Sequence, residues 1–301
     1  MSLLIGSWDY SVCMAEADFH DFEQQGWERA ADRYGDAFGS LTSQTIPSLL
    51  IAAGVGKGTR LLDVASGPGY AAAAAAELGA SPVGVDFSSE MVALAQRRYP
   101  AIEFVEGDAE ALAFDDASFD AVAINFGVLH LAQPDTALSE ARRVLRPGGR
   151  CAFSVWAPPD VSMGFGIVLT AIETHGRMDV PLPAGPPFFR FSDAAESSRS
   201  MIAAGFVEPH VQTVPLVWRL SSGAALFDAF LQGAVRTAAL LRAQTPDAME
   251  KIRRAITAGA EQYRKDSGIE LPMAAVLTSG VRTSCPPLGG PVASNSRGGT
   301  S

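Results

Sequence analysis

Short apolar segments alternate with amphipathic ones along the middle of the chain, from about residue 60 to residue 157. Five apolar segments have the length and composition of buried strands: 60–65, 81–86, 102–106, 119–125 and 150–156. Each is followed by a turn or by a stretch with helical spacing, a pattern typical of a parallel sheet covered by helices on both faces. We therefore expect an α/β fold with a doubly wound, mostly parallel sheet.

Two of the intervening segments carry residues that are typical of helix ends. Ser88 can cap a helix that follows the second strand, and Arg97 and Arg98 suit the negative end of that helix. Asp135 can likewise cap a helix that ends before the Pro147-Gly148-Gly149 turn. These local signals agree with the alternation of strands and helices.

The segment before the core, residues 1–48, is predicted to form an N-terminal helical cap. Its aromatic side chains either pack on the core, which is the interpretation we favour, or line a substrate site, and both can hold at once. These aromatic residues are Trp8, Tyr10, Phe19, Phe22, Trp27, Tyr34 and Phe38.

The segment after the core is less regular. Residues 49–157 form the predicted cofactor-binding core, and 158–281 are expected to supply cap helices and the last two strands of a seven-stranded sheet. The strands are expected over 207–220 and 271–281, and one or two helices over 226–263. Residues 282–301, rich in Gly, Ser and Pro, are predicted to be a disordered tail.

Composition narrows the classes of function. A formal net charge of −10 repels a polyanion, so we expect no nucleic-acid partner. The sequence holds no apolar run of about 18 residues, so we expect no stable membrane insertion and a cytoplasmic location, with the oligomeric state left open. The cysteines Cys13, Cys151 and Cys285 lack the spacing of a disulfide framework or a zinc site.

The strongest local feature is the segment 61–70, LLDVASGPGY, where an apolar strand breaks into a glycine turn before an alanine-rich helix. Gly67 and Gly69 allow the backbone to turn sharply and to approach a ligand closely. The turn also fits the G-x-G-x-x-A pattern of nicotinamide-binding enzymes. Asp86, at the end of the second strand, can accept hydrogen bonds from the ribose of either cofactor, and Asp108, after the third, can accept from an adenine amino group.

Several blocks in this order resemble the class I S-adenosylmethionine-dependent methyltransferases, in particular the small-molecule branch that includes the ubiquinone and menaquinone biosynthesis enzymes. The resemblance covers about residues 45–157. Ala65 departs from it, because the family frequently has glycine there, and Pro68 separates the two remaining glycines. The blocks are LLDVASGPG at 61–69, VGVDFSSEMVALA at 83–95, FVEGDAEALAFDDASFDAV at 104–122, NFGVLHL at 125–131 and EARRVLRPGGR at 140–150.

The resemblance implies a Rossmann-like methyltransferase fold, S-adenosylmethionine as the cofactor and a set of residues that bind it. The glycine turn is expected around the methionine half, Asp86 on the ribose, and Asp108 at the adenine. The segment after the fourth strand is expected at the amino-acid end. The cofactor-binding residues implied are Asp63, Ala65, Ser66, Gly67, Gly69, Asp86, Phe87, Met91, Asp108, Ala109, Asn125 and Phe126.

The implied reaction is in-line methyl transfer to a small molecule, for which no metal is required. The sequence does not identify the acceptor or the accepting atom. His130 is a weak candidate for a general base, and we favour a structural role for it. Tyr34, His130, Trp156 and His175 are candidates for the substrate site, with core packing or surface exposure as the alternatives.

Two alternatives to this enzyme remain open at this point. One is a nicotinamide-dependent oxidoreductase on a similar sheet, and the other is a binding protein that keeps the fold without the reaction. We also hypothesise that the N-terminal helices and the 160–265 segment close over the acceptor. Deleting residues 1–40 would then abolish turnover while cofactor affinity stays largely intact.

Overall fold

The computed structural model of the protein describes residues 10–283, with side chains from residue 18 onward. Trp8, Cys285, the side chains of Tyr10 and Cys13, and residues 284–301 of the expected tail lie outside this description.

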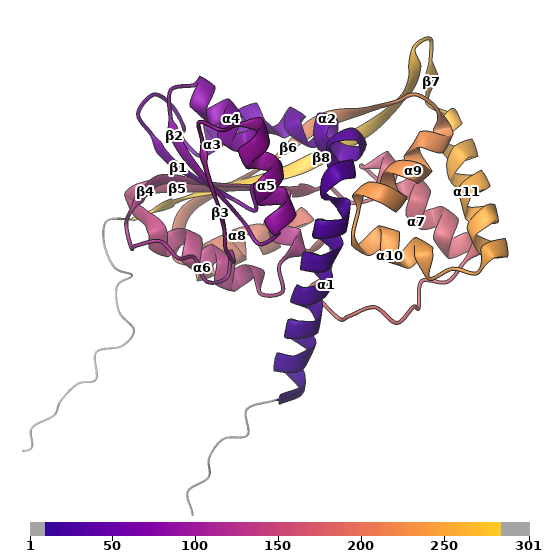
Figure 1. Cartoon of the computed structure of the whole chain (residues 1–301), viewed down its shortest axis with the longest axis horizontal. Helices are drawn as coiled ribbons and strands as arrows, with labels where there is room; N and C mark the ends of the chain where they lie inside the picture. Colours follow the sequence, from indigo (N-terminus) through magenta and orange to yellow (C-terminus); the bar gives the residue numbers. More distant parts are fainter. Residues whose placement is uncertain (1–9, 284–301) are drawn as a thin grey trace, which may run out of the picture.

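The centre of the molecule is a twisted sheet whose strands run in the order β3-β2-β1-β4-β5-β8-β6, with the short β7 paired to β8 (Figure 1). Pairing is parallel from β3 to β5, and β8 is antiparallel to both of its neighbours. The seven strands on this path confirm the predicted α/β, doubly wound and mostly parallel fold. The strands are β1 Arg60–Val64, β2 Ser81–Asp86, β3 Glu103–Glu106, β4 Phe119–Asn125, β5 Leu145–Trp156, β6 Phe206–Leu220, β7 Arg264–Lys265 and β8 Gly268–Arg282.

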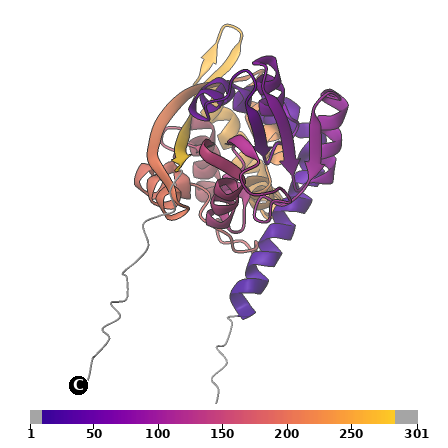
Figure 2. The same cartoon turned by 90° about the vertical axis from the view of Figure 1, so that its left-hand side faces the viewer.

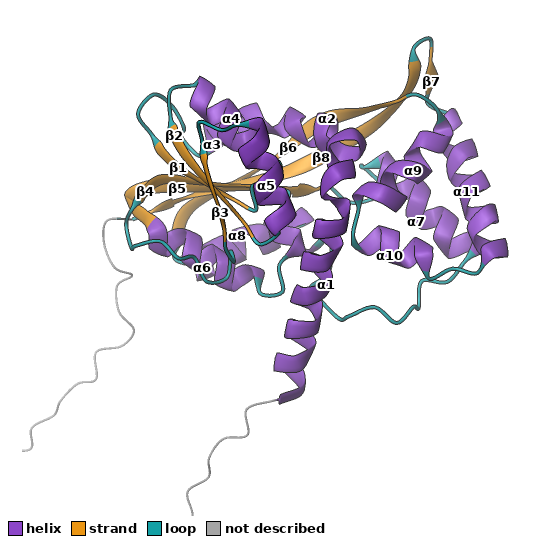
Figure 3. Ribbon diagram, viewed as in Figure 1, coloured by secondary structure: helices purple, strands orange, loops and turns teal. Residues whose placement is uncertain are grey.

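Helices cover both faces of the sheet and gather beyond one of its edges (Figure 3). α3, α4 and α5 pack on one face, and α6 and α8 pack on the other. The buried alanines of α4 have small side chains, which lets this helix lie close to β1 and β2. The helices of the core are α3 Ile46–Ala52, α4 Tyr70–Glu77, α5 Ser89–Arg98, the short helix η3 Val128–His130, α6 Pro134–Val144, the short helix η4 Arg190–Ser192 and α8 Ala194–Ala203.

A separate group of helices lies beside the sheet and forms a cap, and α1 runs between this group and the core (Figure 1). α11 packs against both α7 and α9, and α1 contacts α5 of the core and α9 of the cap. The hairpin of β6, β7 and β8 projects beyond the other strands (Figure 2). The cap and N-terminal helices are α1 Tyr10–Tyr34, the π-helix η1 Gly35–Gly39, α2 Ser40–Thr42, η2 Ser43–Thr45, α7 Met163–His175, α9 Gly223–Gly233, α10 Arg236–Arg242 and α11 Pro246–Glu261.

Most predicted element boundaries agree with the structure, and the differences have local causes. Ser88 caps α5 as predicted, since its side chain accepts a hydrogen bond from the Met91 amide. The cap prediction for Asp135 is wrong. Pro134 occupies the first turn of α6, where a missing N–H costs nothing, and Gln133 is the N-cap. Asp135 instead pairs with Arg190 at 2.7 Å.

The region after β5 differs more from the sequence-based expectation. Three helices, α9, α10 and α11, occupy the segment in which one or two were predicted, because the chain breaks after Gly233 and Thr245 caps a new helix. α8 packs on the sheet and does not join the cap, and β8 extends to Arg282, the first residue of the predicted tail. Among the described residues no single helix is long and apolar enough to cross a membrane. Only the pair α9 and α10, bent by 104°, meets that criterion together.

The turn that starts α4 yields a test of local packing. Gly69 has a left-handed φ of 84°, and a Cβ there would lie 2.6 Å from the Phe104 ring. We expect Gly69→Ala to lower the free energy of unfolding by about 2–5 kcal/mol, because backbone strain and overpacking add.

Gly58→Ala is the matched control, since Gly58 has a φ of 83° but no atom within 4 Å of an added Cβ. It should lose only the strain component, about 1–2 kcal/mol. Equal losses for both variants in denaturant unfolding would contradict a packing role for Gly69.

Candidate functional site

A cavity of about 800 Å³ opens at the carboxyl ends of β1, β2 and β4, where the order of the strands reverses. Ligands of open α/β sheets bind at such a reversal point. Its walls come from the ends of these strands, the loops after them and the inner face of α1. They are Trp27, Tyr34, Asp63, Ala65, Ser66, Gly67, Pro68, Tyr70, Ala71, Asp86, Phe87, Met91, Gly107, Asp108, Ala109, Asn125, Phe126, Gly127, His130 and Leu131.

The turn after β1 forms one wall of this cavity. Ala65 and Gly67 both have left-handed backbone conformations, with φ of 52° and 49°. A Cβ added at Gly67 would meet no protein atom within 4 Å, so the missing side chain leaves open space at the turn. The Gly67 amide donates a 2.8 Å hydrogen bond to Oδ2 of Asp86, which joins the turn to the end of β2. The turn is therefore an open cradle held in place by a buried carboxylate.

Two buried carboxyl groups face the cavity from the ends of neighbouring strands. Burial raises the pKa of Asp63 to about 7, against a hydrogen bond from the Ala72 amide that lowers it. Burial likewise raises the pKa of Asp86 to about 6, and amide donors at Gly67 and Ser88 oppose the rise. The Asp63 Oδ1 atom has no hydrogen-bond partner among the described residues. A cation in the cavity would therefore gain a favourable partner at Asp63.

The third acidic residue, Asp108, lies where α1 meets the core. Its Oδ1 accepts a hydrogen bond from the Glu110 amide at 2.8 Å, and its Oδ2 lies 3.4 Å from Nε2 of His20 on α1. Gln24, one turn further along α1, donates to the carbonyl of Phe87 at 2.8 Å. These contacts hold α1 against this end of the cavity.

The end of β4 is fixed by a buried polar cluster. Oδ1 of Asn125 accepts hydrogen bonds from the hydroxyls of Thr45 and Ser154, both at 2.7 Å, and its amide donates to the carbonyl of Thr42. Phe126 follows with a left-handed φ of 55°, and its ring lies 4.1 Å from that of Trp156. Phe126 lines this cavity and also a second one.

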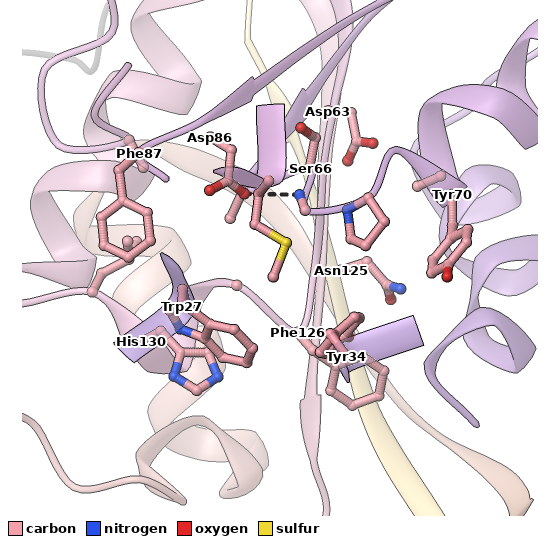
Figure 4. Close-up of a pocket in the computed structure, with 18 of the residues that line it drawn as sticks. Trp27, Tyr34, Asp63, Ser66, Tyr70, Asp86, Phe87, Asn125, Phe126 and His130 are labelled. Carbon is pink, nitrogen blue, oxygen red and sulfur yellow. Dashed lines mark hydrogen bonds between the residues drawn. The ribbon is translucent and has the colours of Figure 1, made fainter. Parts of the chain in front are cut away.

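The second cavity, of about 430 Å³, lies between α1, the strand ends and the cap. Trp27, Tyr34, Phe126 and His130 line both cavities, so the two share a wall of aromatic rings. Figure 4 shows this wall opposite the carboxyl groups of Asp63 and Asp86. The second cavity is lined by Trp27, Tyr34, Phe38, Thr42, Phe126, His130, Trp156, Phe165, Phe188, Gly233, Ala234, Val235, Arg236 and Thr237.

The structure brings eleven of the twelve predicted cofactor-binding residues to the first cavity; Gly69 does not line it. Of the predicted substrate residues, Tyr34 and His130 line both cavities and Trp156 lines the second. His175 is exposed at the end of α7 and lines neither cavity. Burial raises the pKa of Tyr34 to about 12, so its hydroxyl stays protonated near neutral pH.

Several wall residues were not predicted from the sequence. For Trp27 the sequence favours core packing and leaves a role in a substrate site open; its spacing from Tyr34 along one helix places both rings on the same side. Phe165, Phe188 and Arg236 come from the irregular segment after β5, where no local pattern indicates a site. The other wall residues that belong to neither the predicted cofactor set nor the predicted substrate set are Phe38, Thr42, Pro68, Tyr70, Ala71, Gly107, Gly127, Leu131, Gly233, Ala234, Val235 and Thr237.

Because Trp27 and Tyr34 line both cavities, α1 belongs to the wall of the first cavity as well as to that of the second. Deleting residues 1–40 would open both cavities, so that deletion cannot separate acceptor binding from cofactor binding. Within residues 10–283 no group of three or more His, Cys, Asp or Glu side chains is arranged to hold a metal ion. Cys151 is buried, and burial raises the pKa of its thiol to about 12.

Comparison with known proteins agrees with this geometry. A family model described as a methyltransferase domain matches residues 62–153. A demethylmenaquinone methyltransferase from Clavibacter sepedonicus is 44% identical over 121 residues, which cover 38% of this chain and 49% of that protein. The corresponding enzyme from Beutenbergia cavernae is 46% identical over 121 residues, covering 38% and 50%. This chain thus spans about half the length of the curated relatives it matches.

Among solved structures, a phosphoethanolamine N-methyltransferase from Haemonchus contortus, in complex with S-adenosyl-L-methionine, shares the fold. It has a TM-score of 0.54 and 20% identity, and the match covers 88% of this chain and 60% of that one. At this identity the likeness concerns the fold alone. The family model and the curated relatives show that residues 62–153 are similar to a methyltransferase domain.

Proposed function

We propose that the protein transfers a methyl group from S-adenosylmethionine, bound in the first cavity, to a small aromatic acceptor bound in the second. The observation that carries this proposal is the wall that the two cavities share, formed by Trp27, Tyr34, Phe126 and His130. Methyl transfer requires two molecules to meet in line at one point, and holding them there can contribute a large part of an enzyme's rate. Two adjoining cavities provide such an arrangement.

The residues of the first cavity fit the cofactor group by group. The open space at Gly67 accommodates a ligand close to the backbone, and the unpartnered oxygen of Asp63 suits an ammonium group. Asp86 can accept from ribose hydroxyls, and Asp108 from an adenine amino group. When bound, the cofactor supplies a methyl group that its positively charged sulfur activates.

The aromatic wall suits a positively charged ligand and a dry reaction site. Faces of Trp and Tyr rings attract cations, most strongly where water is excluded. Phe126 and Trp156 are buried, and Phe126 lines both cavities. These side chains would exclude water and confine the acceptor, which are the protein's main tasks when the leaving group is already activated.

The second cavity supports an aromatic, largely uncharged acceptor. Phe38, Trp156, Phe165 and Phe188 add further rings to the shared wall. Arg236 is the only cation among the residues lining this cavity, and each of its three guanidinium nitrogens already donates a hydrogen bond to the protein. The curated relatives are named for demethylmenaquinone, a quinone, and an acceptor with a ring system of that kind is compatible with this cavity.

Binding measurements separate this proposal from the nicotinamide-dependent alternative. Titration calorimetry should show binding of S-adenosylhomocysteine and none of NADPH. We expect Asp86→Ala to weaken binding of S-adenosylhomocysteine about 10- to 100-fold, because a charged hydrogen-bond acceptor is lost. Asp160→Ala, at an exposed position outside both cavities, is the matched control and should bind like the wild type. Binding of NADPH alone would overturn the proposal.

The raised pKa values of Asp63 and Asp86 predict that cofactor affinity depends on pH. In the free protein these groups hold protons to about pH 7 and 6, above the ordinary value of 3.8. The folded state therefore binds protons more tightly than the unfolded state, and stability falls as pH rises from about 4 to about 7. An ammonium ligand favours the ionised carboxylates, so its affinity should rise over the same range.

Calorimetry of S-adenosylhomocysteine at pH 6, in two buffers of different ionisation enthalpy, should show protons released on binding. Asp63→Asn should reduce both the proton release and the rise of affinity with pH, since asparagine cannot ionise. Proton uptake, or an affinity independent of pH in the wild type, would contradict the assigned role of Asp63.

A further inference from the structure

A buried cluster of charged groups lies behind the shared wall. The Glu23 side chain on α1 is fully buried, and its Oε1 accepts a 2.6 Å hydrogen bond from Nε of Arg236 on α10. Its Oε2 lies 3.0 Å from Nδ1 of His130 on η3. Burial would raise the pKa of Glu23, but His130 and Arg236 together outweigh it and hold the pKa below its ordinary value. Glu23 is therefore a carboxylate at neutral pH.

Arg236 is held rigidly in this cluster. Its two terminal nitrogens donate to the carbonyls of Pro186 and Leu129, at 2.8 and 2.7 Å, and its guanidinium lies 4.4 Å from the centre of the Phe19 ring. Because these contacts come from separate segments, Arg236 cannot turn toward the cavity without breaking several of them. Arg236 therefore remains paired with Glu23, and Glu23 remains in contact with His130.

The contact with Glu23 determines which nitrogen of His130 can react. A carboxylate only accepts hydrogen bonds, so the neutral imidazole carries its proton on Nδ1 and leaves a lone pair on Nε2. Nε2 has no hydrogen-bond partner among the described residues. The ring packs edge-on against Trp27, with centroids 4.7 Å apart, and against Phe188, and it lines both cavities.

Resting on the proposed methyl transfer, we propose that Nε2 of His130 is the general base that removes the proton from an aromatic hydroxyl of the acceptor. Glu23 is its positioning residue, and Arg236 keeps Glu23 ionised and in place. The acceptor class is thereby narrowed to phenols and hydroquinones, whose nucleophile forms by loss of a proton. A tertiary amine, which has no such proton, would not need this arrangement.

The step balances without any further reactant. The hydroxyl proton moves to Nε2, and the electron pair left on oxygen, or delocalised to a ring carbon, forms the new bond to the methyl carbon. The pair of the broken carbon–sulfur bond stays on sulfur. The imidazolium, stabilised meanwhile by Glu23, then returns its proton to water. For transfer to a ring carbon, the hydrogen displaced from that carbon also leaves as a proton.

The other titratable groups that line the second cavity, Tyr34 and Arg236, do not compete for this role. Tyr34 remains protonated near neutral pH, and Arg236 is paired with Glu23. Asp63, Asp86 and Asp108 line only the first cavity. The charged groups that act on His130 are Glu23 from α1 directly and Arg236 from α10 through Glu23. Its other ring neighbours, Trp27 and Phe188, carry no charge.

The test uses para-nitrophenol, a phenol that absorbs visible light only when ionised, with the full chain and no cofactor. At a fixed pH, the bound probe should be more ionised than the free probe. His130→Gln and Glu23→Gln should each lower the ratio of bound phenolate to phenol about tenfold or more. The first change removes the group that takes the proton, and the second removes the carboxylate that stabilises the resulting imidazolium. His175→Gln, at the exposed histidine outside both cavities, should keep the wild-type ratio.

Circular dichroism verifies that each variant is folded. If Glu23→Gln unfolds because Arg236 is left buried without its partner, His130→Gln still decides, since it keeps the Glu23–Arg236 pair. An unchanged ratio in folded Glu23→Gln would reduce Glu23 to a packing residue and overturn its assignment. Three results would overturn the assignment of His130 as the general base. They are a bound probe no more ionised than the free one, an unchanged ratio in His130→Gln, and no binding of the probe. Binding of S-adenosylhomocysteine, measured separately, would leave the proposed function standing in those cases.

Discussion

A carboxylate without access to water must be neutralised, and the fully buried Glu23 sets this constraint at the centre of the molecule. Its partners, His130 and Arg236, belong to the core and to the cap, respectively. The contacts of Glu23 with His130 and Arg236 hold α1 across the carboxyl ends of the strands, and they hold the cap against α1. The rings of Trp27 and Tyr34 reach the cavities because they project from the same helix. The shape of the site thus depends on a buried carboxylate that lines neither cavity.

The sheet contributes a complementary set of constraints. The parallel strands β1 and β2 have their carboxyl ends on the same side of the sheet. Side chains at these ends therefore lie close together without contacts from distant parts of the chain. Asp63 and Asp86 are buried at that edge and are held by backbone amides, which keeps them in place before any ligand arrives. A pre-formed acidic and glycine-lined cavity on the sheet then meets a mainly aromatic cavity under the cap. This division matches a reaction between a charged, polar cofactor and an apolar acceptor.

The sequence alone predicted the first of these cavities far better than the second. Strands β2 and β4 match their expected bounds because their burial pattern is local, and the acidic residues follow from their place at strand ends. The second cavity depends on contacts between distant residues: Glu23 and His130 are 107 positions apart, and Glu23 and Arg236 are 213 apart. The periodicity of apolar residues does not indicate contacts between residues so far apart in the sequence. The cap helices were misjudged for a similar reason, since the breaks after Gly233 and before Thr245 depend on how α9 to α11 pack together.

The most direct measurement is a crystal structure of the protein grown with S-adenosylhomocysteine. The division into two cavities predicts that the ligand lies along Asp63, Asp86 and Asp108, with its sulfur at the wall formed by Trp27, Tyr34, Phe126 and His130 and facing the second cavity. A sulfur directed away from that wall, or a ligand bound outside the first cavity, would contradict it.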